Sequence, residues 1–152
     1  MKQRIYIDTS VVGGYFDDEF KDATKDFFEL AFKTRPVLLI SDLLEFELSA
    51  APVFVRNFFA SIPTDMISKV EVNEEARVLA MMYVNEKIVG ETSLGDCQHI
   101  ATATLNYADV LVSWNFKHIV NLPRIRGYNS INLREGYHPI EIRTPKEIFR
   151  YE

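Results

Sequence analysis

Short apolar runs alternate along the chain with longer stretches in which apolar residues recur at helical spacing. Apolar runs of strand length lie at residues 4–8, 37–41 and 110–114, and a fourth, IEIR, lies near the end of the chain. The first three lack the polar alternation of a half-exposed strand, which is typical of strands buried on both faces of a sheet. Such strands, alternating with helices, predict an α/β fold with a mostly parallel central sheet covered by helices on both faces.

Helical spacing and end signals predict the helices between these runs. Apolar residues from Ala23 to Ala31 mark a helix over residues 22–33, which follows a Gly13-Gly14 loop. The other predicted helices cover residues 43–50 after a cap at Asp42, residues 53–60, a stretch capped by Asn73, a stretch begun by Ser93 and Asp96, a stretch around Tyr128 that Gly136 and Pro139 close, and a short terminal helix begun by the capping box Thr144-Pro145-Lys146-Glu147.

The composition is that of a single domain without disulfides. The 152 residues are 47% hydrophobic and include one cysteine, which has no partner within the chain. A chain of this length buries roughly 70% of the surface that its unfolded form exposes, so it needs no disulfide or metal to fold. No charged leader opens the sequence, and no apolar run approaches the ~20 residues that cross a bilayer. We expect one domain over residues 1–152, in the cytoplasm and without a membrane segment.

The net charge of −5, from 17 basic and 22 acidic residues, argues against one class of function. Domains that bind nucleic acid by general polycation attraction carry a basic surplus, because their affinity comes from displacing the counterions of the phosphates. A nucleic-acid partner of this chain would have to be held by a local site.

Polar residues follow the predicted strands at the edge where an α/β sheet binds its ligands. Asp8 comes directly after the first strand, Asp42 after the second and Asn115 just past the third. Ligands of open parallel sheets bind beyond the carboxyl ends of the strands, so these positions are candidates for a site. For Asp8 considered alone, a turn residue is an equally good interpretation.

Two further carboxylates occupy helix positions that face the packed side. At about 100° per residue, Glu47 shares a face with Leu44 and Leu48, whereas Glu45 lies on the other side of the helix. An ionised carboxylate turned toward a core needs a partner or a metal. Alternatively, Glu47 lies at the lip of the apolar face and reaches water, and Glu45 replaces it as a ligand. Asp96 heads the packed face of its helix, where it also offsets the helix dipole.

Asp8, Glu47 and Asp96 are thus three carboxylates on separate elements that we expect to face one crevice. Oxygen-only clusters suit Mg²⁺ or Mn²⁺. Such an ion favours phosphate chemistry, because it lowers the pKa of a bound water and stabilises the leaving oxygen. Two divalent ions would add four charges and move the formal total from −5 to −1, which removes much of the objection to a nucleic-acid substrate.

Four segments resemble, in order, the motif blocks of the PIN domain: IYIDTSVV, SDLLEFEL, GDCQHIATA and VLVSWNFKHI. The final INLREGYHPIEIRTPKEI is similar to the end of bacterial PIN proteins related to VapC-type toxins, so the resemblance covers essentially the whole chain. It implies a Rossmann-like three-layer α/β/α fold and a metal-dependent nuclease that usually acts on RNA. Many bacterial members of this family are toxins that a cognate antitoxin silences, and they form homodimers.

The acidic set of the family falls on Asp8, Glu47 and Asp96, and its fourth acidic position falls on Asn115. An asparagine offers a neutral oxygen, which implies weak binding of a second ion or the use of one ion, with Asn115 assisting through a water. Supporting roles fall on Ser113, which matches a hydroxyl position of the same block, and on Thr9 or Ser10, which would orient Asp8 or a metal-bound water. The nearest basic residues in sequence, Lys117, Arg124 and Arg126, would hold the RNA backbone or form a solvated face.

Competing chemistries lack the residues they need. No G-x-G-x-x-G follows the first strand and the chain has no Walker loop, which disfavours nucleotide-cofactor and P-loop functions. The three histidines have no close Cys or His partner for zinc, and we interpret them as surface or locally bonded residues: His99, His118 and His138. We expect Cys97 in the core, Trp114 in packing contacts and Asp109 in a turn.

The sequence therefore predicts a metal-dependent endoribonuclease that hydrolyses RNA phosphodiester bonds as the toxin of a type II toxin–antitoxin pair. The alternative is a catalytically weak or inactive PIN-like module that binds nucleic acid or protein, with a metal site weakened by Asn115.

Overall fold

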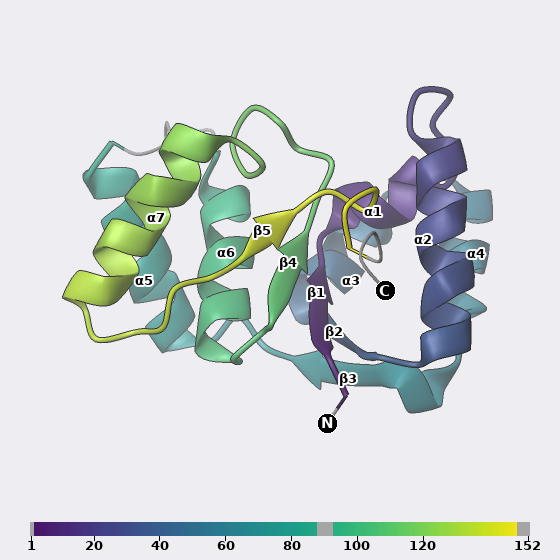
Figure 1. Ribbon diagram of the computed structural model, residues 1–152, viewed down its shortest axis with the longest axis horizontal. Helices are drawn as coiled ribbons and strands as arrows, with labels where there is room; N and C mark the ends of the chain where they lie inside the picture. Colours follow the sequence, from purple (N-terminus) through teal and green to yellow (C-terminus); the bar gives the residue numbers. More distant parts are fainter. Residues whose placement is uncertain (1, 88–92, 149–152) are drawn as a thin grey trace.

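Five parallel strands form one sheet at the centre of the computed structural model, which describes residues 2–87 and 93–148. The strands are β1 (Arg4–Ile7), β2 (Val37–Ser41), β3 (Ile67–Val70), β4 (Val110–Val112) and β5 (Ile142–Arg143), in the spatial order β3-β2-β1-β4-β5 (Figure 1). Ile5 of β1 pairs with Leu38 of β2 on one side and with Val110 of β4 on the other. The four predicted strands and the parallel sheet are confirmed.

Helices cover both faces of this sheet. One face is covered by α1 (Thr9–Gly14), α2 (Lys21–Thr34), α3 (Asp42–Leu48) and α4 (Val53–Ala60). The other face is covered by α5 (Glu74–Asn85), α6 (Leu94–Leu105) and α7 (Leu122–Arg134) (Figure 1). Successive strand residues alternate between the two cores: Ile5 and Ile7 pack with α1 to α4, and Tyr6 packs with α5 to α7. The molecule is therefore the three-layer α/β/α structure that we predicted.

Two elements differ from the prediction. The edge strand β3 is missed because its sequence, ISKV, places Ser68 and Lys69 between its two apolar residues and so lacks an apolar run. Gly13 and Gly14, expected in a loop, are the last two residues of α1. A Cβ atom on Gly14 would lie only 2.7 Å from Cδ1 of Trp114, so the glycine there allows the indole to approach the helix rather than the chain to turn.

The helix ends confirm some predicted caps and correct others. Asn73 caps α5 as predicted, because its side chain accepts a hydrogen bond from the Ala76 amide. The cap of α3 is Ser41 rather than Asp42, whose Oδ1 accepts from the Val72 amide instead. Ser93 precedes α6, but its side chain makes no capping bond.

The predicted capping box near the end of the chain forms one of its two backbone bonds, that from the Thr144 amide to Glu147, without starting a helix in the described residues. Glu147 Oε1 accepts hydrogen bonds from both the amide and the hydroxyl of Thr144. Residues 145–148 form turns, and the rest of the predicted terminal helix lies outside the described residues.

Two predictions about single side chains are also confirmed. Cys97 is fully buried, and Trp114 is 8% exposed, stacks on Phe20 and donates from Nε1 to the Thr24 hydroxyl. Within the described residues, no helix has the length and apolar character needed to span a membrane.

Candidate functional site

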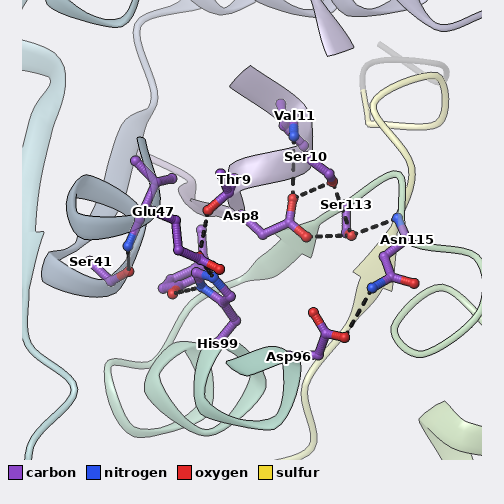
Figure 2. A network of polar contacts seen from close by, with 12 residues as sticks. Asp8, Thr9, Ser10, Val11, Ser41, Glu47, Asp96, His99, Ser113 and Asn115 are labelled. Atoms are coloured by element: carbon purple, nitrogen blue, oxygen red, sulfur yellow. Dashed lines mark hydrogen bonds and ion pairs between the residues drawn. The ribbon is translucent and has the colours of Figure 1, made fainter. Parts of the chain in front are cut away.

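Part of the predicted site lies at the carboxyl ends of β1 and β4, the two strands where the chain reverses its direction of progress across the sheet. From β1 the chain proceeds to β2 and β3 on one side, and then returns to the other side of β1 to form β4. Ligands of open parallel sheets bind at such a point. Asp8 follows β1 directly, and Ser113 and Asn115 follow β4 (Figure 2).

Asp8 is buried and held by three donors. Its Oδ1 accepts hydrogen bonds from the Ser10 hydroxyl at 2.6 Å and from the Val11 amide at 3.3 Å. Its Oδ2 accepts from the Ser113 hydroxyl at 2.6 Å, so the two serines hold the carboxylate from opposite oxygens (Figure 2). The next residues of the β4 loop are tied to these serines, since the amide of Trp114 donates to Ser10 Oγ and that of Asn115 donates to Ser113 Oγ.

Asp96, in the first turn of α6, faces Asn115 from the other side of the site. The Asn115 side-chain amide donates to Oδ2 of Asp96 at 3.1 Å (Figure 2). The Asn115 side-chain oxygen accepts instead from the amides of Lys117 and His118. Asn115 therefore presents its NH₂ group to the site, and its oxygen, which we expected to serve the metal centre, stabilises the following turn.

Glu47 of α3 lies at the lip of the apolar face, and its partners come from two other elements. Its side chain is 38% exposed, more than the inward-facing position predicts. Its Oε1 accepts from the Thr9 hydroxyl and contacts Nε2 of His99, both at 2.7 Å. Thr9 thus serves Glu47 rather than Asp8. Glu45, the alternative ligand, points elsewhere and forms an ion pair with Lys69 of β3.

The three carboxylates differ in their electrostatic surroundings. Burial raises the pKa of Asp8 above its usual range, although His99 and the two serine bonds oppose the rise. Burial also raises the pKa of Asp96, and the nearby charge of Asp8 raises it further. For Glu47 burial acts in the same direction, but the bonds from His99 and Thr9 outweigh it and lower the pKa. Asp8 and Asp96 therefore repel each other, whereas the charge of Glu47 is compensated by its donors.

The donor set around Asp8 and Asp96 fits a hard divalent cation. Mg²⁺ is bound through one or two carboxylates and keeps several waters, and a cation between these two groups would relieve their repulsion. In the described part of the chain, no three or more His, Cys, Asp or Glu side chains are grouped so that they could hold a metal ion together. A shared three-carboxylate site that includes Glu47 stays a prediction.

The remaining predicted residues are one lysine, two arginines and one aspartate outside the acidic set. Lys117 and Arg126 are exposed, and Arg124 is partly buried on α7. Asp109 has the structural role that we expected, because its carboxylate accepts from the Arg4 amide at 2.7 Å at the start of β1.

His99 is not a surface residue: it is a buried histidine bonded to other side chains, and one of its partners is Tyr6. His99 is 2% exposed and lies between Glu47 and the hydroxyl of Tyr6, which is 2.6 Å from Nδ1. His99 stands three residues after Asp96 on α6, so helical spacing alone places both side chains on one face and could have drawn attention to it. Nothing in the sequence singles out Tyr6, because a tyrosine inside a strand is an ordinary core residue.

Solved structures share this architecture with the chain. The toxin–antitoxin complex from Klebsiella pneumoniae has a TM-score of 0.61 and 17% identity, and the match covers 95% of this chain and 99% of that chain. VapBC2 from Rickettsia felis, bound to a promoter DNA fragment, has a TM-score of 0.57 and 15% identity, with 93% of this chain and 98% of that chain covered. FitAB, bound to a DNA fragment, has a TM-score of 0.60 and 10% identity, with 97% of this chain and 99% of that chain covered. The chain has a PIN-like fold. Neither a family model nor a curated protein matches its sequence.

The PIN-like fold explains why four separate sequence blocks carry the candidate site. They correspond to the end of β1, to α3, to the first turn of α6 and to the end of β4. Three of these blocks supply a carboxylate and the fourth supplies Ser113 and Asn115.

Proposed function

We propose that this protein is a metal-dependent endoribonuclease that hydrolyses RNA phosphodiester bonds, and that it is the toxin of a type II toxin–antitoxin pair. The observation that supports the proposal best is the pairing of two repelling carboxylates, Asp8 and Asp96, at the switch point of the PIN-like sheet. Two carboxylates that repel each other at a ligand-binding edge disfavour an anionic phosphate unless a cation joins them.

Asp8 and Asp96 would hold Mg²⁺ or Mn²⁺, and Glu47 would contact the same ion or its water. When bound, such an ion supplies a water of lowered pKa and stabilises the developing charge on the leaving oxygen. Ser10 and Ser113 orient Asp8 by their two short hydrogen bonds. Asn115 donates to Asp96 and fixes the carboxylate from the side of β4.

RNA contacts away from the carboxylates would come from the basic residues near the end of β4. Lys117 and Arg126 are exposed, and the electrostatic effect of Arg124 and Lys117 on His118 places both of them close to that ring. With a net charge of −5, these few side chains and the metal ion would supply the local attraction for phosphate.

An antitoxin protein and a second copy of the chain are the proposed partners. The similar solved structures include toxin–antitoxin complexes that cover nearly the whole chain, which supports an antitoxin partner. The homodimer follows from the family resemblance alone.

A calorimetric titration with Mn²⁺, paired with a cleavage assay on single-stranded RNA, tests the proposed function. The wild-type protein should bind Mn²⁺ and cut RNA, and Asp8→Asn should lose both while it still unfolds in a cooperative thermal transition. Asp18→Asn is the matched control, because the Asp18 side chain is fully exposed on the loop before α2. RNA cleavage that persists in EDTA, or that Asp8→Asn leaves unchanged, would rule the proposal out.

A second candidate function is a PIN-like module that binds nucleic acid or protein without cutting it. The Asn115 geometry favours it, because the side-chain oxygen that would replace a fourth carboxylate is engaged by two backbone amides. The titration above separates the two functions: the non-cutting module would bind RNA with no change of RNA length at any Mn²⁺ concentration.

A further inference from the structure

A buried chain of hydrogen bonds runs from the middle of β1 to the carboxylate of Glu47. The Tyr6 hydroxyl and Nδ1 of His99 are 2.6 Å apart, and Nε2 of the same ring is 2.7 Å from Oε1 of Glu47. These contacts join three elements, β1, α6 and α3, across 93 and 52 residues of sequence. The contact between His99 and Glu47 is visible in the close view of the site (Figure 2).

The direction of each hydrogen bond follows from its partners. The Glu47 carboxylate can only accept, so the proton on that side is carried by Nε2. In the neutral ring, Nδ1 then has a free lone pair and accepts from the Tyr6 hydroxyl. A phenol hydroxyl is protonated at neutral pH, because its ordinary pKa is about 10, so Tyr6 can donate this bond.

The histidine is held in place far more firmly than the glutamate that it contacts. Tyr6 is 0% exposed and His99 is 2% exposed, and the two rings also meet edge to face. Glu47, by contrast, is 38% exposed on a seven-residue helix, and an exposed glutamate has many rotamers available. A fixed donor at Oε1 selects one of them.

The two donors of Glu47 also act on the same oxygen. His99 Nε2 and the Thr9 hydroxyl both bind Oε1, and Oε2 takes no part in either contact. A carboxylate held in this way by one oxygen can present the other to a cation or a water.

We propose that His99, held in place by Tyr6, is a positioning residue: it holds Oε1 of Glu47 so that Oε2 would be free to serve the proposed ion or its water. This inference rests on the proposed function, and it assigns a role to two residues outside the acidic set. Because His99 acts through Glu47, removing it should have no further effect once the Glu47 carboxylate is gone.

A double-mutant cycle tests this dependence. The proteins are the wild type, His99→Leu, Glu47→Gln and the variant with both changes, each measured for Mn²⁺ affinity by calorimetry and for kcat on single-stranded RNA. His99→Leu should weaken Mn²⁺ binding or lower kcat by about 10- to 100-fold, as is typical for the loss of an outer-shell partner. The double variant should match Glu47→Gln within about 2-fold, because the two effects are coupled.

Three conservative variants complete the experiment. His99→Gln keeps a donor for Glu47, so its Mn²⁺ affinity and kcat should be close to those of the wild type. Tyr6→Phe removes the hydrogen bond that holds the His99 ring, so it should lower Mn²⁺ affinity or kcat by less than His99→Leu does. These two variants preserve side-chain size and remain informative if His99→Leu does not fold. His138→Gln is the matched control, since His138 is exposed and contacts Tyr107 away from the site.

The outcomes separate this inference from the proposed function. If Glu47→Gln abolishes cleavage and both His99 variants leave Mn²⁺ affinity and kcat unchanged, the positioning role is wrong and the proposed function stands. If the double variant loses a further factor of 10 or more beyond Glu47→Gln, His99 acts independently of Glu47 and the inference is overturned. If the wild type neither binds Mn²⁺ nor cuts RNA, the proposed function itself fails.

Discussion

The Ser113 hydroxyl donates a 2.6 Å hydrogen bond to Oδ2 of Asp8, across 105 residues of sequence. The same hydroxyl oxygen accepts from the Asn115 amide, so one buried serine joins the end of β1 to the loop that follows β4. Ser10 makes the reciprocal connection, because it donates to Asp8 and accepts from the Trp114 amide. The candidate site is therefore built on the junction of two neighbouring strands rather than on a loop alone.

Replacing Ser113 with alanine should reduce both stability and metal binding. The change leaves the Asn115 amide without its acceptor and removes a donor from Asp8, and an unsatisfied buried group costs about 1–3 kcal/mol. We expect the free energy of unfolding in urea to fall by that amount and Mn²⁺ affinity to fall by about 10-fold or more. Ser130→Ala, at an exposed position of α7, should change neither quantity. Equal effects of the two substitutions would contradict the role assigned to Ser113.

Gly14→Ala should displace the single tryptophan of the chain. The new Cβ atom would lie within 3.0 Å of both the Trp114 ring and the Thr24 hydroxyl that the ring donates to. Such overpacking costs about 1–3 kcal/mol. A red shift of the tryptophan emission should accompany the loss, because the indole moves toward water.

Gly13→Ala is the control for that experiment. It lies in the same helix with nothing within 4 Å of its added Cβ atom. Alanine in a helix is favoured over glycine by roughly 0.5–1 kcal/mol, so this variant should be as stable as the wild type or more stable, with unchanged fluorescence. A destabilisation equal to that of Gly14→Ala would show that the space around Gly14 is not limiting.

The stability of the metal-free protein should respond to pH through Asp8. Because burial raises the folded-state pKa of Asp8 above its unfolded value, the ionised form is disfavoured in the fold. The stabilising contribution of the protonated group is complete below the unfolded pKa and is lost as the pH rises through the folded pKa. In EDTA, Asp8→Asn should thus gain stability relative to the wild type as the pH is raised from 4 to 7.5, measured by thermal melts at each pH. A gap between the two proteins that stays constant over this range would contradict the raised pKa.

Cys97 should be unreactive in the native protein. Burial raises its pKa to about 12, with the nearby Asp96 charge adding to the effect, so almost no thiolate exists at neutral pH. Alkylation with iodoacetamide at pH 8 should proceed at the rate of unfolding and should accelerate in urea. Fast modification of the folded protein would place Cys97 at the surface.

The sheet and its layers can be predicted from the sequence because buried parallel strands are short apolar runs, which are recognisable from neighbouring residues alone. The edge strand β3 escapes that pattern, since a strand with one solvated side tolerates Ser68 and Lys69. The candidate site can likewise be predicted only where local patterns locate its residues. Strand ends and helix faces locate Asp8 and Asp96, but the partners of Glu47 depend on contacts across 38 and 52 residues that no local spacing encodes.

The orientation of Asn115 shows the same limit. The sequence indicates that the side-chain amide of Asn115 replaces a carboxylate, but it does not show which way that amide points. The turn that follows decides this, because the backbone amides of Lys117 and His118 bind the Asn115 oxygen, which leaves its NH₂ group to face Asp96.

The most direct measurement is the metal-dependent cleavage of a single-stranded RNA by the wild type and by Asp96→Asn at equal protein concentration. We expect the wild type to cut with Mg²⁺ or Mn²⁺ and to stop in EDTA. We expect Asp96→Asn, with its thermal transition intact, to be slower by at least ~100-fold, the upper end of the loss expected even for an outer-shell partner. Asp18→Asn should cut like the wild type. Cleavage by Asp96→Asn at the wild-type rate would contradict the assignment of the site.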